Sequence, residues 1–380
     1  MTPVPDGIAP SVDPAPVLPA WGAGCVSDLV PALLGLVAPE AVGLPELAEV
    51  PATTPTVLLV LDGIGSRQVA QRPTIAPTLN RLQRREITTV APSTTAAALS
   101  SITTGLAPGD HGVVGYRMLV DDQVLNSLRW GSAEQRDARR TVPPDLVQPF
   151  DPFCGQSPPV VSKAEFARTG FTTAHLRGAR LHGYRTPAVL VHEVERLVED
   201  GESFVYAYWD GVDKVSHEYG LGTEYDAELA FADRLVADLE ARLPAGTRLV
   251  VTADHGQVDC GRGEIELAAG RRDGVELLSG EGRFRWLHTR PGAADDVADL
   301  LEEVHGHLAW VCHLDQVLDE AWFGPTVRAE VVDRLGDIAL VPHASVSFAD
   351  PDDTGLFPLI GRHGSLTSDE MLVPLAITVV

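Results

Sequence analysis

The chain has 380 residues, 44% of them hydrophobic, and a formal net charge of −24 at pH 7 (29 Lys and Arg against 53 Asp and Glu). This much apolar material excludes a wholly disordered protein, and the acidic balance argues against a protein that coats nucleic acid or anionic lipid. A small anionic substrate is still compatible with this charge, because a bound metal ion inverts the field locally.

The N-terminus has neither the positive start nor the apolar core of a signal peptide. No run approaches the roughly 18 uninterrupted apolar residues of a membrane span. We therefore expect a cytoplasmic protein without a membrane partner.

The cysteines are far apart in sequence, so we expect free, mostly buried thiols and no cysteine-based zinc site; they are Cys25, Cys154, Cys260 and Cys312.

Residues 1–52 are rich in Pro, Ala and Val, and we expect an extension packed on the core with one helix at 26–37. The first strong strand is Thr56–Leu61, an apolar run typical of a strand buried on both faces of a parallel sheet. Phe204–Trp209 and Arg248–Thr252 follow the same pattern, and residues 374–380 are a fourth candidate.

Helical patterns lie between these strands, over Ala76–Gln83, Thr95–Thr104 and 225–242. The alternation predicts an α/β fold, with a doubly wound, mostly parallel central sheet and helices on both faces. Residues 53–260 and 341–380 would form this core. Residues 261–340, which hold a strand at Phe284–Leu287 and an acidic helix at Ala294–His305, would form a smaller inserted lobe.

Three of the predicted strands are followed by an aspartate: Asp62, Asp210 and Asp254. In an open α/β sheet, ligands bind beyond the carboxyl ends of the strands. Crowded, buried carboxylates would repel one another, so a shared cation explains them best. Solvated loop aspartates or helix N-caps are the alternative for any one of them.

Histidines accompany these carboxylates. His255 follows Asp254 directly, Asp213 and His217 are four residues apart on a predicted helical turn, and His363 is next to a glycine. A lone histidine is usually structural, but mixed oxygen and nitrogen ligands suit Zn²⁺ or Mn²⁺.

A hydroxyl-rich segment, PSTTAAALSSITTG, opens the helix over Thr95–Thr104. The first turn of a helix favours negative charge, which suits an alkoxide nucleophile and phosphate oxygens. From the residues alone, an ordinary N-cap is the favoured interpretation of Thr94 or Thr95.

The ordered motifs VLDG, PSTT, TTGLAPGDHG, DKVSHEYG, TADHG and GRHG resemble the alkaline phosphatase superfamily, and most of all its type I phosphodiesterase/nucleotide pyrophosphatase family. The resemblance extends from Asp62 to His363. It implies two zinc ions, with Mn²⁺ as the alternative, and Thr95 as the nucleophile. The ligands it implies are Asp62, Thr95, Asp254 and His255 for one metal, and Asp213, His217 and His363 for the other.

Two departures from the family pattern concern the substrate. The family places an asparagine shortly after the nucleophile, where this chain has Ala98; Asn126 is our candidate substitute for holding a phosphate oxygen. No clear match exists to the arginine of the superfamily's phosphate monoesterases, which favours diester substrates.

The resemblance also implies a structural role for His111 near the site. For His305, His307 and His313 we prefer surface or core positions to a third metal site.

The implied activity is hydrolysis of phosphodiester or pyrophosphate bonds in a nucleotide or related small molecule, through a covalent phospho-threonine intermediate. A phosphonate hydrolase of the same superfamily and a non-catalytic metal-binding relative are the alternatives, and a phosphoglycerate mutase fits less well. We expect no nucleic acid polymer as partner. Pocket walls are expected from residues 113–160 and 261–340, with Tyr116, Trp130 and Trp209 either stacking on a nucleobase or packing in the core.

Overall fold

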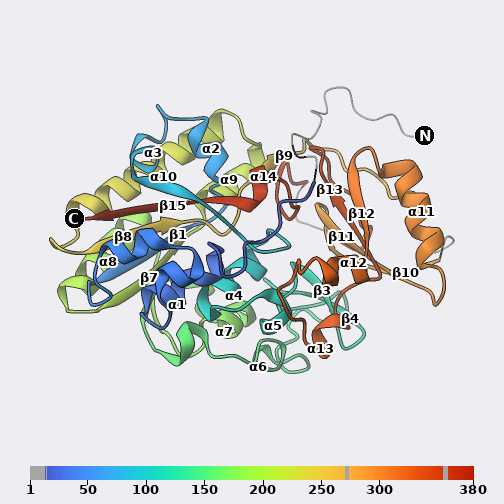
Figure 1. Cartoon of the computed structure of the whole chain (residues 1–380), viewed down its shortest axis with the longest axis horizontal. Coiled ribbons are helices and arrows are strands. Elements are labelled where there is room, and N and C mark those ends of the chain that lie inside the picture. The colour runs from blue at the N-terminus through green and yellow to red at the C-terminus, as the bar shows by residue number, and fades with distance from the viewer. Residues whose placement is uncertain (1–12, 14, 270–273, 354–357) are drawn as a thin grey trace.

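The structure is a computed structural model, and it describes residues 13, 15–269, 274–353 and 358–380. A seven-stranded sheet runs through its larger part (Figure 1), in the order β2-β15-β8-β1-β7-β5-β6. The strands are β1 (Thr56–Leu61), β2 (Gln83–Thr88), β5 (Pro159–Lys163), β6 (Arg180–Tyr184), β7 (Phe204–Trp209), β8 (Arg248–Thr252) and β15 (Leu372–Val379).

The central sheet is mostly parallel, as predicted. β1 pairs in parallel with both β7 and β8, and β5 pairs in parallel with β6 and β7. β15, which overlaps the strand predicted at residues 374–380, is antiparallel to β8 and β2. Leu61 pairs with Trp209, and Val60 pairs with Thr252, so the chain leaves β1, β7 and β8 at one edge of the sheet.

Helices cover both faces of this sheet, which confirms the prediction of a sheet between two layers of helices. In Figure 1, α2, α3, α9 and α10 lie above the sheet, and α1, α4 and α7 lie below it. The helices of this part of the molecule include α1 (Leu29–Leu33), α2 (Ser66–Ala70), α3 (Pro77–Leu82), α4 (Thr95–Thr104), α7 (Gly170–Leu176), α8 (Pro187–Glu199), α9 (Gly211–Tyr219) and α10 (Thr223–Arg242).

Of two predicted helices, one is much shorter in the structure and the other has the predicted bounds. The helix predicted at 26–37 is a 3₁₀ turn, Val26–Asp28, followed by the single short helix α1. It ends early because Gly35 adopts a left-handed conformation (φ 70°), which stops a helix. The helix predicted at Thr95–Thr104 has these bounds in the structure, since Gly105 (φ 73°) caps it.

A second, four-stranded antiparallel sheet lies beside the first, at the right of Figure 1, in the order β10-β11-β13-β12. Its strands are β10 (Val275–Glu281), β11 (Phe284–Thr289), β12 (Ala309–His313) and β13 (Ile338–Pro342), and α11 (Ala294–His305) packs against them. Leu287, Leu301 and Leu340 belong to its own buried cluster. The exact limits of the inserted lobe stay a prediction.

Short elements connect these layers: β3 (Arg117–Val120), β4 (Gln123–Asn126), β9 (Val258–Asp259), β14 (Gly361–Arg362), α5 (Pro108–His111), α6 (Pro144–Val147), α12 (Leu314–Asp319), α13 (Ala329–Val332), α14 (Ser368–Met371), and 3₁₀ turns at Pro39–Val42, Pro45–Glu49, Pro152–Gly155 and Ala164–Phe166. All four cysteines are free thiols, two of them buried, while Cys154 is exposed. Within the described ranges, no helix has the length and apolarity needed to cross a membrane.

Candidate metal centre

In the described part of the chain, two carboxylates at the edge of the central sheet have no lysine or arginine partner. Asp62 follows β1 and Asp254 lies two residues after β8, and both are buried. Burial and the neighbouring carboxylates raise the pKa of both groups. Among the described residues, Asp62 Oδ1 and Asp254 Oδ2 have no hydrogen-bond partner, although they are buried. A bound cation would satisfy both oxygens, so the donor set fits a metal ion.

The third aspartate of the edge has a different environment. Asp210, directly after β7, forms ion pairs with Lys163 (2.5 Å) and Lys214 (2.8 Å). These are the only two lysines of the chain. The expectation that all three aspartates share one cation is therefore wrong for Asp210, because ammonium groups of the protein already balance its charge.

Three histidines are oriented for metal binding by the backbone. Nδ1 of His255 lies 3.0 Å from the Gly256 carbonyl oxygen, and Nδ1 of His217 lies 2.7 Å from that of Gly361. Nδ1 of His363 lies in the same way 3.0 Å from a carbonyl oxygen. Each Nδ1–H can donate to its carbonyl, which leaves Nε2 with the lone pair that a metal ligand needs.

The Nε2 atoms of these histidines face the carboxylates. His255 Nε2 lies 3.4 Å from Asp62 Oδ1, while His217 and His363 Nε2 lie 3.3 and 3.7 Å from Asp213 Oδ1. Burial lowers the pKa of His255 and His363, which favours the neutral imidazole. Uncharged imidazole is the form that binds metals.

Among the residues that the structure describes, two groups of side chains could each hold a metal ion, and both lie here. One is Asp213, His217 and His363, and the other is Asp62, Asp213 and His255, with ligand atoms within 4.8 Å of one another. The first group is the set expected for the second metal. The other shares Asp62 and His255 with the set expected for the first metal, and Asp254 Oδ2 lies 3.6 Å from His255 Nε2.

The structure therefore brings together all six carboxylate and imidazole ligands that the resemblance implied. The two groups are adjacent, because the rings of His255 and His363 stack with centroids 3.6 Å apart. Two side chains outside the predicted set hold the carboxylates in place: the Tyr208 hydroxyl donates to Asp62 Oδ2, and Gln257 Nε2 donates to Asp213 Oδ1 (2.6 Å).

The nucleophile candidate lies at the same place. Thr95 is the first residue of α4, and its Oγ1 lies 3.1 Å from His255 Nε2. Thr94 occupies the N-cap position without a capping hydrogen bond from its side chain. Of the two threonines left open by the sequence, Thr95 therefore has its hydroxyl beside the candidate metal ligands.

A cavity of about 240 Å³ begins at Thr95, Asp62 and Asp213. Apart from these, its walls are mostly apolar or aromatic and include Leu99, Leu128, Phe166, Phe171, Tyr206 and Tyr208. The expectation of walls from 113–160 and 261–340 is wrong for this cavity, where only Leu128 comes from those ranges. The alternating tyrosines of β7, which end next to Asp210, were the signal that sequence reasoning missed.

The other candidates lie elsewhere. Trp130 is fully buried and donates to the Val142 carbonyl, and Trp209 packs on Phe231, so both serve the core. Tyr116 is not among the residues that line the cavity. Asn126 Oδ1 accepts a hydrogen bond from the Arg129 backbone, a local role; its role toward substrate stays a prediction.

Two further histidine predictions have structural outcomes. His111 is buried, with Nε2 2.9 Å from Ser101 Oγ and Nδ1 accepting from the Val113 amide. His305 is buried and packs edge-on against Phe348. The described part of the chain holds no third metal-binding group that includes His305, His307 or His313.

Comparison with known proteins identifies the family and the fold of the chain. A model of the type I phosphodiesterase/nucleotide pyrophosphatase family matches residues 56–366. Murine ectonucleotide pyrophosphatase/phosphodiesterase 5 has a similar structure, with a TM-score of 0.63 and 17% identity over 84% of this chain and 87% of that chain. The human form gives a TM-score of 0.60 and 16% identity, with 84% and 87% covered.

Phosphonoacetate hydrolase from Sinorhizobium meliloti, solved in complex with phosphonoformate, is similar at a TM-score of 0.62 and 19% identity, with 86% and 90% covered. No curated protein matches the sequence significantly. At these identities the solved structures show the shared alkaline-phosphatase-like fold, and the family model adds the membership. The chain is thus a hydrolase of the alkaline phosphatase superfamily and belongs to the type I phosphodiesterase/nucleotide pyrophosphatase family.

Proposed function

We propose that the protein hydrolyses phosphodiester or pyrophosphate bonds of a nucleotide or related small molecule, with two divalent metal ions and a covalent phospho-threonine intermediate. One observation carries the proposal: Thr95 Oγ1 lies 3.1 Å from the Nε2 of His255 within a cluster of oxygen and nitrogen ligands. A hydroxyl so placed is set for nucleophilic attack rather than for helix capping.

The ligand set indicates where the ions would bind. Asp62, Asp254, His255 and Thr95 would hold one, and Asp213, His217 and His363 the other. Mixed carboxylate and imidazole ligands suit Zn²⁺, with Mn²⁺ as the alternative. Bound metal ions would supply a lowered pKa for the Thr95 hydroxyl and positive charge for the phosphoryl oxygens.

The remaining chemistry belongs to the chain. Thr95 Oγ1 forms a bond to phosphorus while the bond from phosphorus to the leaving oxygen breaks, and the leaving group departs as an alcohol or a phosphate. Water then breaks the bond between Oγ1 and phosphorus, which restores the hydroxyl and releases the phosphoryl product. The N-terminus of α4 favours the negative charge that the reaction brings to this place.

The cavity beside Thr95 would receive the organic part of the substrate. Tyr206, Tyr208, Phe166 and Phe171 provide aromatic surface, which suits a nucleobase or an aromatic ester. An inactive variant of the murine relative was solved in complex with AMP, which supports a nucleotide. Phosphonoacetate bound to the bacterial relative keeps a phosphonate as the second candidate substrate.

The proposal is tested with purified protein assayed against a p-nitrophenyl phosphodiester, the p-nitrophenyl phosphate monoester and phosphonoacetate. We expect the diester to be the best substrate, with activity lost on chelation and restored by Zn²⁺. Preference for phosphonoacetate would favour the phosphonate hydrolase, and zinc binding without turnover of any of the three would favour the non-catalytic relative.

A cytoplasmic location stays our prediction, which fractionation of cells would test.

A further inference from the structure

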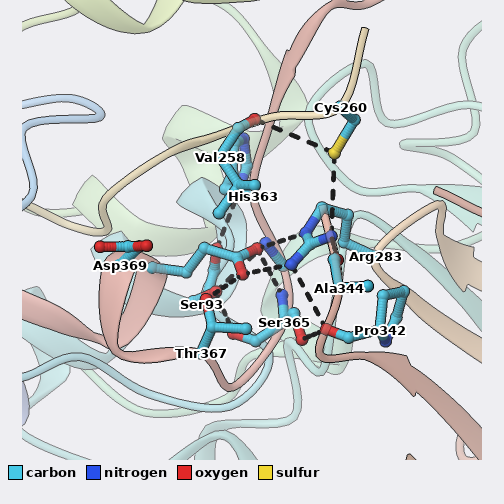
Figure 2. Close-up of polar contacts among 12 residues, drawn as sticks. Ser93, Val258, Cys260, Arg283, Pro342, Ala344, His363, Ser365, Thr367 and Asp369 are labelled. Atoms are coloured by element: carbon cyan, nitrogen blue, oxygen red, sulfur yellow. Dashed lines mark hydrogen bonds and ion pairs between the residues drawn. The ribbon is translucent and has the colours of Figure 1, made fainter. Parts of the chain in front are cut away.

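A buried arginine–glutamate pair joins the four-stranded sheet to the segment that follows His363. Arg283 lies in the turn between β10 and β11, Glu370 lies in α14, and both side chains are fully buried. Arg283 Nε donates to Glu370 Oε1 (2.8 Å), and Nη2 donates to Oε2 (2.7 Å). Figure 2 shows the guanidinium group at the centre of this network. Such a two-bond fork fixes orientation as well as distance.

Arg283 is itself held firmly in place. Its Nη1 donates to the carbonyl oxygens of Ala344 (2.8 Å) and Val346 (2.6 Å), in the segment that follows β13. The rigid guanidinium therefore ties Glu370 to the backbone beside the four-stranded sheet.

Glu370 in turn holds the turn that carries His363. Its Oε1 also accepts from the Ser365 amide (3.0 Å), and its Oε2 accepts from the Thr367 hydroxyl (2.5 Å). One carboxylate thus receives two bonds from Arg283 and two from residues just after His363. The position of this turn depends on both sets of bonds.

Ser93 connects the turn to the imidazole (Figure 2). Its hydroxyl donates to the Ser365 carbonyl (2.6 Å) and accepts from the Gly364 amide (3.1 Å). Its own carbonyl oxygen lies 3.0 Å from His363 Nδ1. This contact directs the Nε2 of His363 toward Asp213. A continuous series of contacts therefore leads from Arg283 to a candidate metal ligand.

Stability alone is a weak reason for such a pair, because well-packed apolar residues often stabilise a core as well as buried ions do. We propose that Arg283 and Glu370 are positioning residues: they orient His363 and so set the metal affinity of the Asp213, His217 and His363 group. This inference rests on the proposed metal-dependent function.

The test compares zinc binding by wild type and by the double variant Arg283→Met/Glu370→Leu, in which no buried charge is left unpaired. Titration against a competing chelator gives the dissociation constants of the two zinc equivalents. We expect one constant to be unchanged and the other to rise about 10- to 100-fold, the usual effect of removing groups that orient a metal ligand. The weakened equivalent should be the one that His217→Ala removes.

Two further variants make the result specific. Arg283→Lys keeps the charge next to Glu370 but not the fork, and we expect it to weaken the same equivalent by roughly five-fold. If the double variant does not fold, Arg283→Lys takes its place in the test. The matched control is Arg117→Met, since Arg117 is also a buried arginine but pairs with Asp350; both zinc constants should stay within two-fold of wild type.

The inference is overturned if the double variant, or Arg283→Lys in its place, keeps both wild-type constants. It is also overturned if both constants rise equally, because that outcome indicates a general loosening of the fold. Thermal unfolding of the metal-free proteins monitors this, and similar melting temperatures are expected. A wild type that binds no zinc would instead contradict the proposed function.

Discussion

Asp254 and Asp210 occupy similar places in the central sheet but have opposite surroundings. Asp254 lies just past β8 and Asp210 just past β7, the two strands that flank β1. Asp210 forms ion pairs with the two lysines of the chain, whereas Asp254 has no lysine or arginine partner in the described part and faces only His255, whose pKa is lowered by burial. A strand-end aspartate therefore does not by itself indicate a metal ligand; the missing counter-charge does.

The same contrast applies to the buried histidines. His111 has a protein partner for each ring nitrogen, Ser101 and Val113. His255 instead has Nδ1 on a backbone carbonyl and Nε2 among Thr95 and two carboxylates. Four predictions probe these comparisons, from the largest expected effect to the smallest.

The largest effect is expected at Thr95. Thr95→Ala removes the hydroxyl that would attack phosphorus, so kcat for a phosphodiester should fall at least about 10³-fold while zinc content stays near wild type. Thr94→Ala, the matched neighbour at the N-cap, should lose less than about ten-fold. Full activity of Thr95→Ala would end the covalent proposal.

The stabilisation that bound zinc gives to the fold should depend on Asp254 but not on Asp210. Saturating zinc at about 1,000 times the dissociation constant should stabilise the wild type by about 4 kcal/mol per site, measured by chemical unfolding with and without chelator. Asp210→Asn should keep this zinc-dependent gain, and Asp254→Asn should lose about half of it. Equal losses would show that the missing counter-charge does not distinguish the two positions.

The free energy of unfolding should depend on pH in a way that reveals the lowered pKa of His111, which a solvent-exposed histidine would not produce. Burial, with Arg328 and Arg334 nearby, lowers the pKa of His111 to about 3 in the folded state. The unfolded chain takes up this proton below about pH 6.5 and the folded chain does not, so its stabilising contribution is complete above pH 6.5 and is lost as the pH falls.

The measurement is the free energy of unfolding of metal-free wild type and His111→Gln at pH 7 and pH 4. The amount by which the wild type exceeds the variant in this free energy should be about 3 kcal/mol smaller at pH 4 than at pH 7, because only the wild type carries the histidine with the lowered pKa. A gap that does not depend on pH would contradict the lowered pKa.

The smallest effects are opposite in sign. In metal-free protein at pH 7, Asp254→Asn should stabilise the fold by about 1–2 kcal/mol, because it removes a buried carboxylate whose pKa burial has raised. Asn keeps an oxygen for the Gly63 and His255 amides. Asp210→Asn should destabilise by about 1–2 kcal/mol, because it leaves two partly exposed lysines without their partner.

Much of the site could be predicted from the chain. The apolar runs of β1, β7 and β8 end at an edge where ligands bind, and Gly105 marks the end of α4. The ordered motifs then identified the family, which was confirmed. Local periodicity and turn chemistry suffice for such features, because each depends on neighbours in sequence.

The tertiary structure decided everything that depends on partners distant in the chain. Only the fold shows that Lys163 balances Asp210, that Tyr206 and Tyr208 line the cavity, and that Arg283 reaches Glu370. The reversed direction of β15 is also a matter of assembly, since its apolar pattern is the same for either direction. Burial and charge pairing are properties of residues that folding brings together, so sequence spacing cannot specify them.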